Sequence, residues 1–184
     1  MSPERARLFE LLRELSFARR AITLASGRTS HFYVDVRNTA LHPEGATLLG
    51  RALLALLDTA PEVRAVAGPS IGADPLVTSI AIASHTAGRA VPALMVRPEA
   101  KAHGTGQRVE GMRNVPVGSA VAVVEDVITS GGSALRTIAA LREAGLEPVC
   151  VLAVIDRQEG GREAIGLPVQ ALFTKSDFGV TDAL

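Results

Sequence analysis

The sequence is poor in several residue types, and each shortage excludes a class of protein. It has no tryptophan and one tyrosine in 184 residues, and aromatic residues make up 3% of the chain. That is too few to stack successive bases of a single-stranded nucleic acid. Its single cysteine, Cys150, excludes an internal disulfide framework and a cysteine-based zinc cluster. A lone cysteine also fits the reducing cytoplasm.

A surplus of charge of one sign is lacking as well. The chain has 19 lysines and arginines and 19 acidic residues, a formal net charge of zero, which argues against binding nucleic acid or a membrane surface by bulk electrostatics. The longest stretch without a charged residue, 75–88, contains Ser, Thr and His and is too short to span a membrane. Residues 1–15 resemble an amphipathic helix rather than a signal peptide. We therefore expect a cytoplasmic protein that meets any anionic ligand with local groups.

Short apolar runs rich in β-branched residues alternate along the chain with longer helical patterns. The runs cover 63–67, 91–96, 120–124, 149–155 and 169–173. The helical patterns cover 43–58, 74–87 and 133–144. Runs that are apolar at successive positions suit strands covered on both faces. The sequence therefore predicts an α/β fold with a doubly wound, mainly parallel five-stranded sheet flanked by helices, as one domain over 1–184.

Two segments depart from this rhythm. Near the N-terminus, strand-like pieces at 22–24 and 32–36 lie on either side of turn-forming residues, which predicts a small hood, mainly within 1–40. The second segment, 97–111, follows a predicted strand but is too polar and glycine-rich for a packed helix. We expect a mobile loop there.

The segment 120–133, AVAVVEDVITSGGS, is the most informative. An apolar strand leads into two acids, two apolar residues and a hydroxyl- and glycine-rich turn that opens a helix. Open α/β sheets bind ligands beyond the carboxyl ends of their strands, and free N–H groups at a helix N-terminus bind phosphate. We expect Thr129–Ser133 to hold a phosphate, and Glu125 and Asp126 to accept hydrogen bonds from two neighbouring ribose hydroxyls. A lone turn of this kind more often only caps a helix.

The wider context favours a ligand site. Val121–Ser133 resembles the signature of type I phosphoribosyltransferases: four apolar residues, two acids, two apolar residues, then Thr-x-Gly and a hydroxyl. Three further segments resemble, in the same order, the hood, the catalytic loop and the late strand-end motif of the orotate-using members of that family: Leu24–Asp35, Arg97–Gly104 and Ile155–Gly160.

The resemblance implies the type I phosphoribosyltransferase fold and a reaction of pyrimidine biosynthesis. In that reaction a phosphoribosyl group passes from phosphoribosyl pyrophosphate to orotate, giving orotidine 5′-monophosphate and pyrophosphate. The cofactor implied is Mg²⁺, held mainly by the substrate and not directly by protein side chains. A homodimer is implied too, with the catalytic loop of one subunit reaching the site of the other.

The resemblance also implies roles for individual residues. Lys101, His103 and Asp126 would be catalytic, and cations of the loop would stabilise the charge on the departing pyrophosphate. Gly68–Asp74 would bind pyrophosphate, with a cis Ser70–Ile71 peptide as in related enzymes. The substrate-binding set is Tyr33, Ser70, Ile71, Gly72, Arg97, Lys101, His103, Glu125, Asp126, Val127, Ile128, Thr129, Ser130, Gly131, Gly132, Ser133 and Arg157.

This chain departs from the family pattern in three cations. Many members carry lysine where it has Ala25, Gly72 and Pro98. Because orotate is an anion, the loss of these lysines weakens the assignment of orotate as acceptor more than the assignment of phosphoribosyl pyrophosphate as donor. A purine phosphoribosyltransferase and a non-catalytic regulator that senses phosphoribosyl pyrophosphate therefore stay open, although the retained Lys101 and His103 argue against the regulator.

A rival enzyme class rests on Gly68-Pro-Ser-Ile-Gly72, which also fits the G-x-S-x-G nucleophile elbow of α/β-hydrolases. That fold requires an acid and then a histidine after the serine. The histidines after Ser70 are His85, inside a predicted helix, and His103, which precedes every later strand-end acid. The order disfavours a hydrolase.

Overall fold

The computed structural model describes residues 2–18, 22–23, 29–30, 32–60, 62–99 and 107–180; for 22–23 and 29–30 it describes the backbone alone. Its helices are α1 (Pro3–Leu11), α2 (Arg37–Ala40), α3 (Pro43–Leu56), α4 (Asp74–Thr86), α5 (Gly132–Glu143) and α6 (Gly161–Ile165). Its strands are β1 (Phe17–Ala18), β2 (Ile22–Thr23), β3 (Thr29–Ser30), β4 (Tyr33–Val34), β5 (Ala65–Pro69), β6 (Ala93–Val96), β7 (Val109–Glu110), β8 (Ala120–Ile128), β9 (Glu147–Asp156) and β10 (Val169–Thr174). A short π-helix is η1 (Leu12–Ser16), and short 3-10 helices are η2 (Leu57–Thr59), η3 (Met112–Asn114) and η4 (Lys175–Phe178).

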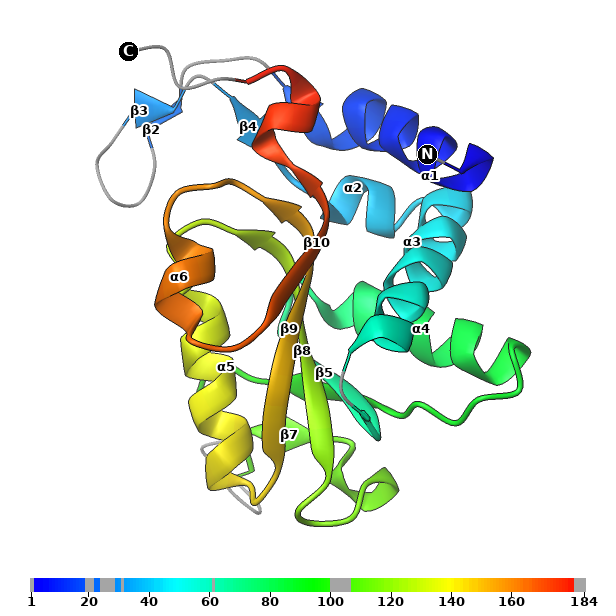
Figure 1. Cartoon of the computed structure of the whole chain (residues 1–184), viewed down its shortest axis with the longest axis vertical. Coiled ribbons are helices and arrows are strands. Elements are labelled where there is room, and N and C mark those ends of the chain that lie inside the picture. The colour runs from blue at the N-terminus through cyan, green and yellow to red at the C-terminus, as the bar shows by residue number, and fades with distance from the viewer. Residues whose placement is uncertain are drawn as a thin grey trace.

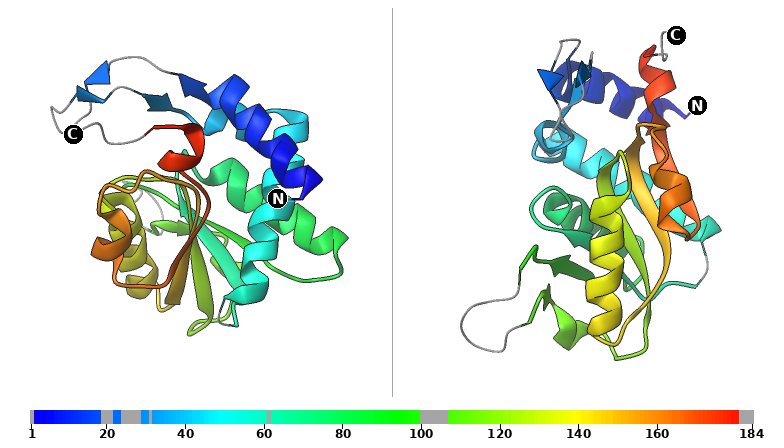
Figure 2. Two further views of the ribbon diagram at one scale, coloured as in Figure 1. Left: turned by 45° about the horizontal axis from the view of Figure 1, so that its top comes forward. Right: turned by 90° about the vertical axis from the view of Figure 1, so that its left-hand side faces the viewer.

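The central sheet has six strands in the order β10-β9-β8-β5-β6-β7. All neighbours are parallel except β6 and β7. Helices α5 and α6 cover one face and α3 and α4 the other, so the sheet is doubly wound as predicted (Figure 1). The carboxyl ends of β8 and β9 point toward the hood and η4, which lie together at one end of the molecule (Figures 1 and 2).

The strands are apolar at successive positions because each face of the sheet has its own core. In β8, Ala122 and Val124 belong to one buried cluster, while Val121 and Val123 belong to the other. Side chains alternate between faces along a strand, so both sets must be apolar. The five predicted parallel strands are all present. The sixth, β7, lies in the segment predicted as loop and adds an antiparallel edge through the pairs Met95–Glu110 and Val96–Val109.

The predicted helices begin and end close to their sequence signals. Pro43 opens α3, and the His42 side chain caps it by accepting a hydrogen bond from the Gly45 N–H at 3.4 Å. Helix α5 is followed by Gly145, whose φ of +78° suits a glycine after a helix C-terminus.

Cys150 is fully buried in β9, and burial raises the pKa of its thiol to about 11, so it is an inert core residue.

The hood is built from two short antiparallel pairs. Strand β1 pairs with β4, Phe17 opposite Val34, and β2 pairs with β3, Ile22 opposite Ser30. Both predicted strand pieces are found in shortened form. The partner of β2 is Thr29–Ser30, which the sequence analysis assigned to the turn, and the partner of β4 is Phe17–Ala18, for which no strand was predicted. The hood lies over the carboxyl ends of the parallel strands (Figure 2), where open α/β sheets bind ligands.

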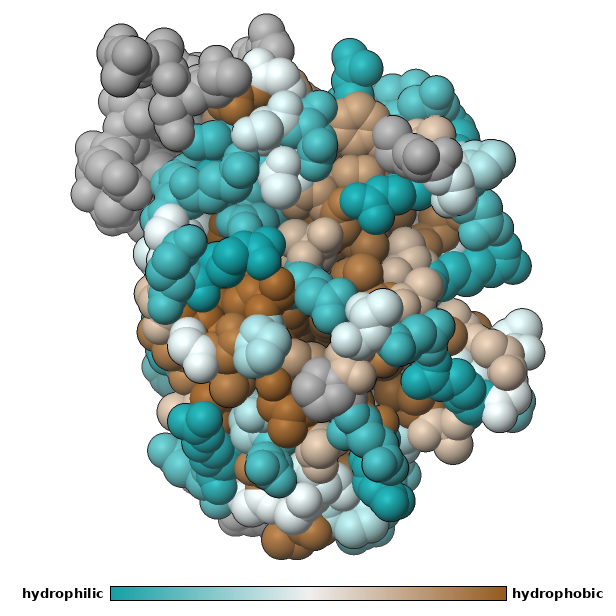
Figure 3. Space-filling view, viewed as in Figure 1, coloured by the Kyte–Doolittle hydropathy of each residue, from teal (hydrophilic) through white to brown (hydrophobic). Residues whose placement is uncertain are grey.

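The space-filling view shows apolar side chains gathered over the middle of one face, with polar side chains around them (Figure 3). Among the helices in the described part of the chain, none has the length and apolar character needed to cross a bilayer.

Candidate active site

The two adjacent acids lie inside β8 rather than after it. The sequence predicted the strand to end at Val124, but pairing with β9 continues through Val127–Ile155 to Ile128–Asp156. The neighbouring strand therefore carries β8 four residues further than its apolar run indicates. As consecutive strand residues, Glu125 and Asp126 point to opposite faces of the sheet.

Glu125 is the more buried of the two acids, with 2% of its surface exposed. Burial raises the pKa of its carboxyl to about 8; a hydrogen bond with Ser133 works in the opposite direction, and the Asp126 charge adds to the rise. Its Oε1 atom is buried without a hydrogen-bond partner among the described residues. A buried carboxylate oxygen in this state is suited to accept a ligand hydroxyl.

Asp126 also has a raised pKa, mainly because it is buried, and the backbone N–H of Val127 lowers the pKa by donating to Oδ1 at 2.8 Å. The positive charge of Arg37 acts on Asp126 in the same direction. This aspartate thus faces the hood, whereas Glu125 faces α5.

The turn Thr129–Ser133 forms a cradle at the N-terminus of α5. Gly131 has a φ of +79°, and no side chain caps the first turn of the helix. A cavity of about 140 Å³ lies over the turn and is lined by residues 129–134 and by Glu125, Val127 and Ile128. Uncapped amides beside a cavity form an anion site. Every predicted phosphate-binding residue from Thr129 to Ser133 lines it.

A second cavity, of about 330 Å³, adjoins the cradle and opens beneath the hood. Four residues line both cavities: Glu125, Val127, Thr129 and Ser133. The rest of its wall comes from Tyr33, Val34, Asp35, Arg37, Pro69, Ser70, Gly72, Asp126 and Arg157. A ligand can therefore extend from the cradle past both acids to the hood. The volume suits a small polar molecule.

The loop after β5 contains the predicted cis peptide, Ser70–Ile71. Ser70 and Gly72 line the larger cavity, whereas Ile71 lines neither cavity and is 69% exposed. The Ser70 hydroxyl donates to Asp74 Oδ1 at 2.8 Å. Of the two histidines after Ser70, His85 does not line a cavity with it, and His103 lies outside the described residues.

Arg157 follows β9 directly and is buried, with 6% of its surface exposed. Its Nε donates to Glu159 Oε1 at 2.9 Å, and its guanidinium carbon lies 4.3 Å from the centre of the Phe32 ring. This ion pair is largely buried, with side-chain exposures of 7% for Arg157 and 18% for Glu159, and Arg157 lines the larger cavity.

Arg97, which begins the predicted catalytic loop, does not line either cavity. Its Nε pairs with Glu110 Oε1 at 2.9 Å, and its backbone N–H donates to the carbonyl of Arg108 at 2.8 Å. These contacts close the base of the loop. The two central cations, Lys101 and His103, lie outside the described residues, as does Ala25.

Two charged residues of the larger cavity were not predicted from the sequence. Arg37 donates to both carboxylate oxygens of Asp35, from Nε and Nη2, each at 2.8 Å. This pairing lowers the pKa of Asp35. Arg37 is the first residue of α2, and its backbone N–H also donates to Asp35 Oδ1 at 3.1 Å. The pair therefore forms where the hood strand passes into a helix, a junction that the sequence analysis did not predict.

The described residues contain no group of three or more His, Cys, Asp or Glu side chains able to hold a metal ion. The acids of the site are split between the two faces of β8. A magnesium ion at this site would therefore need oxygens from the substrate.

Comparison with known proteins gives a consistent result. No family model matches the chain. It is 47% identical over 178 residues to the orotate phosphoribosyltransferase of Sorangium cellulosum, covering 95% of this chain and 93% of that protein. It is 42% identical over 180 residues to that of Nostoc sp., covering 96% and 86%. Among solved structures, Mycobacterium tuberculosis orotate phosphoribosyltransferase in complex with phosphoribosyl pyrophosphate has a TM-score of 0.78 and 38% identity, covering 97% of this chain and all of that one.

Proposed function

The chain belongs to the orotate phosphoribosyltransferase family, and on that premise we propose how its residues hold the substrates and promote the transfer. It is a transferase of pyrimidine biosynthesis. It moves the phosphoribosyl group of phosphoribosyl pyrophosphate to a ring nitrogen of orotate, and the products are orotidine 5′-monophosphate and pyrophosphate.

The proposed placement of the substrates rests on one observation: the two cavities share part of their lining, so one ligand can extend through both. The 5′-phosphate occupies the cradle Thr129–Ser133, where the amides of α5 are uncapped. The ribose lies over the acids, with Glu125 and Asp126 accepting its hydroxyls from the two sides of β8. The pyrophosphate then lies against Ser70 and Gly72 on the neighbouring loop.

Orotate occupies the remaining part of the larger cavity, under the hood. Arg157 supplies a buried cation for this anionic, planar base, and Tyr33 closes the opposite wall. A buried arginine whose plane is fixed is suited to a carboxylate or to a ring carbonyl. Thr129, which lines both cavities, lies where sugar and base meet.

The chemistry places positive charge on the sugar and negative charge on the leaving pyrophosphate. The Asp126 carboxylate stabilises the positive charge, and Lys101 and His103 on the loop, with Arg97 at its base, stabilise the negative charge. Bound magnesium would be held mainly by the substrate and would neutralise further charge on the pyrophosphate. Closing the loop excludes water, which protects the reactive sugar from hydrolysis.

We further propose that the protein is a cytoplasmic homodimer, in which the catalytic loop of each subunit reaches the active site of the other. The proposal is supported by the loop base: Arg97 and Arg108 bond to each other through their backbones and line neither cavity of their own subunit. In the proposed dimer, the loop of the partner subunit would bring Lys101 and His103 to each site. The balanced charge of the chain also fits a cytoplasmic enzyme of small molecules.

An acceptor screen tests the function. The loss of orotate absorbance is followed with phosphoribosyl pyrophosphate and magnesium, beside parallel assays with adenine, hypoxanthine, xanthine and uracil. Turnover of orotate alone is the expected result. Turnover of a purine instead would contradict the acceptor, and turnover of no base would favour a regulator that binds the donor.

A further inference from the structure

Two residues fix the guanidinium of Arg157 from different directions. Glu159 binds its Nε edge at 2.9 Å, and Phe32 lies against its flat face, 4.3 Å from the guanidinium carbon to the ring centre. Phe32 is itself 5% exposed, so this contact is shielded from water. An ion pair alone leaves an arginine free to rotate about the bonded atom. A ring on its face removes that freedom.

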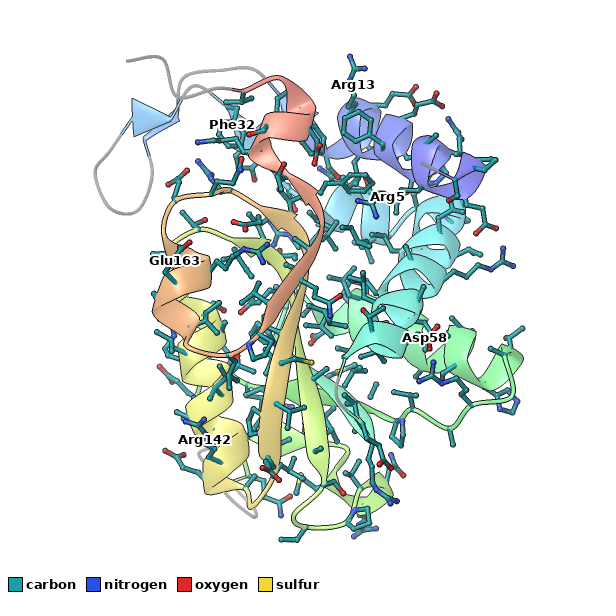
Figure 4. The ribbon with its side chains drawn as sticks, in the orientation of Figure 1. Arg5, Arg13, Phe32, Asp58, Arg142 and Glu163 are labelled. Atoms are coloured by element: carbon teal, nitrogen blue, oxygen red, sulfur yellow. The ribbon has the colours of Figure 1, made fainter. Side chains whose placement is uncertain are left out.

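Phe32 is anchored by a chain of aromatic rings that contains all five phenylalanines of the protein. Successive ring centres are 6.0 Å apart for Phe32–Phe17, 5.1 Å for Phe17–Phe178, 4.8 Å for Phe178–Phe9 and 5.3 Å for Phe9–Phe173. These rings come from α1, the hood, β10 and η4. Figure 4 shows Phe32 at the junction of the hood and the turn η4. The cluster thereby fixes the hood on the edge of the sheet where Arg157 lies.

We propose that Phe32 is a positioning residue for orotate binding, which it serves by orienting Arg157 toward the base. This inference rests on the proposed role of Arg157. Phe32 lines neither cavity, so it acts through the arginine and not by touching substrate. The neighbouring residue Tyr33 does line the cavity. The hood strand therefore serves the site with two consecutive residues, one on each side of the strand.

The test compares Phe32→Leu with Phe17→Leu. Both replace a ring of the same cluster by an aliphatic side chain, but only Phe32 contacts Arg157. Phe32→Leu is expected to raise KM for orotate about tenfold, with KM for phosphoribosyl pyrophosphate and kcat within about twofold of the parent. Phe32→Tyr keeps the ring face and should restore orotate KM. Phe17→Leu should lower the melting temperature and raise orotate KM by no more than about threefold, because Phe17 supports the Phe32 ring but does not itself orient Arg157.

An equal rise in orotate KM in Phe17→Leu, or none in Phe32→Leu, would overturn the proposal. If Phe32→Leu does not fold, Phe32→Met replaces it under the same criteria, since methionine is similar in size and has no ring. Arg157→Ala separates this proposal from the proposed function. An unchanged orotate KM in Arg157→Ala would refute the role of the arginine itself. We expect Arg157→Ala to raise orotate KM. If Phe32 acts through Arg157, the double variant Phe32→Leu/Arg157→Ala should have the same orotate KM as Arg157→Ala.

Discussion

Gly72 lies directly against the carboxylate of Asp126: a Cβ atom at position 72 would be 2.6 Å from Asp126 Oδ2. Real Cβ atoms do not approach an oxygen that closely, so any side chain at this position must move the aspartate. The family pattern described above has lysine at the position of Gly72 in many members. In this chain the Asp126 carboxylate lies where the first side-chain atom at position 72 would be.

We therefore expect Gly72→Ala to impair catalysis by turning Asp126 away from the sugar. KM for phosphoribosyl pyrophosphate should rise and kcat fall, each about tenfold, while the melting temperature changes little. Steady-state kinetics with both substrates give the result. Restoring the family lysine, Gly72→Lys, should not help, and a variant with raised kcat/KM would contradict this account. The effect of Gly72→Ala should also largely vanish in an Asp126→Asn background.

Removing the loop lysine should reduce turnover more than binding. We expect Lys101→Ala to lower kcat about 100-fold with the dissociation constant of phosphoribosyl pyrophosphate nearly unchanged, because its contact forms mainly in the transition state. Arg113→Ala is the matched control, since Arg113 is an exposed cation on η3, outside both cavities. Equal losses of binding and turnover in Lys101→Ala would contradict the assigned role.

The buried Glu125 predicts a proton-coupled donor affinity. Its pKa of about 8 lies well above the ordinary value of 4.5, so the unliganded protein holds this proton at neutral pH. Ribose hydroxyls donate to the ionised form, so binding favours loss of the proton. Affinity should then strengthen as pH rises toward about 8, by at most about tenfold per pH unit.

Calorimetry at neutral pH, in two buffers of different ionisation enthalpy, measures the protons released on binding phosphoribosyl pyrophosphate. Glu125→Gln cannot ionise and should release fewer protons than the parent. The comparison also removes the contribution of the ligand phosphates, which is common to both proteins. Identical proton release in the two would place the titration elsewhere.

Gly161 packs directly against the backbone of the phosphate cradle. A Cβ at this position would be 2.5 Å from the Thr129 carbonyl oxygen and 2.8 Å from the Gly131 nitrogen. Gly161→Ala should therefore displace the cradle and weaken donor binding about tenfold or more. Gly166→Ala, at the other end of α6, strains a backbone with a φ of +69° but has nothing within 4 Å. It should lower stability alone; weaker donor binding in this control would refute the specific role of Gly161.

Local patterns made the strand-turn-helix from Ala120 to Glu143 predictable, since the apolar run, the glycines and the helix start lie within one short segment. Sequence could not reveal that β8 continues to Ile128, because that extension depends on pairing with β9. Strand β7 was missed for the same reason: Val109 and Glu110 become a strand only beside β6.

The residues that line the candidate site were predictable where the motif is contiguous and not where distant segments meet. The cradle residues and Arg157 could be named from their own motifs. The contact of Phe32 with Arg157 depends on how the hood lies over the sheet, and so does the place of the local Arg37–Asp35 pair in the cavity wall. The aromatic cluster that fixes the hood joins residues from both ends of the chain, a separation that no local pattern encodes.

The central claim is that the β8–α5 junction holds a phosphorylated pentose, and a crystal structure with ribose 5-phosphate tests it most directly. We predict the phosphate on the backbone amides of Thr129–Ser133 and the ribose hydroxyls within hydrogen-bond distance of Asp126. A sugar bound away from Asp126, or a phosphate held outside that turn, would contradict the account.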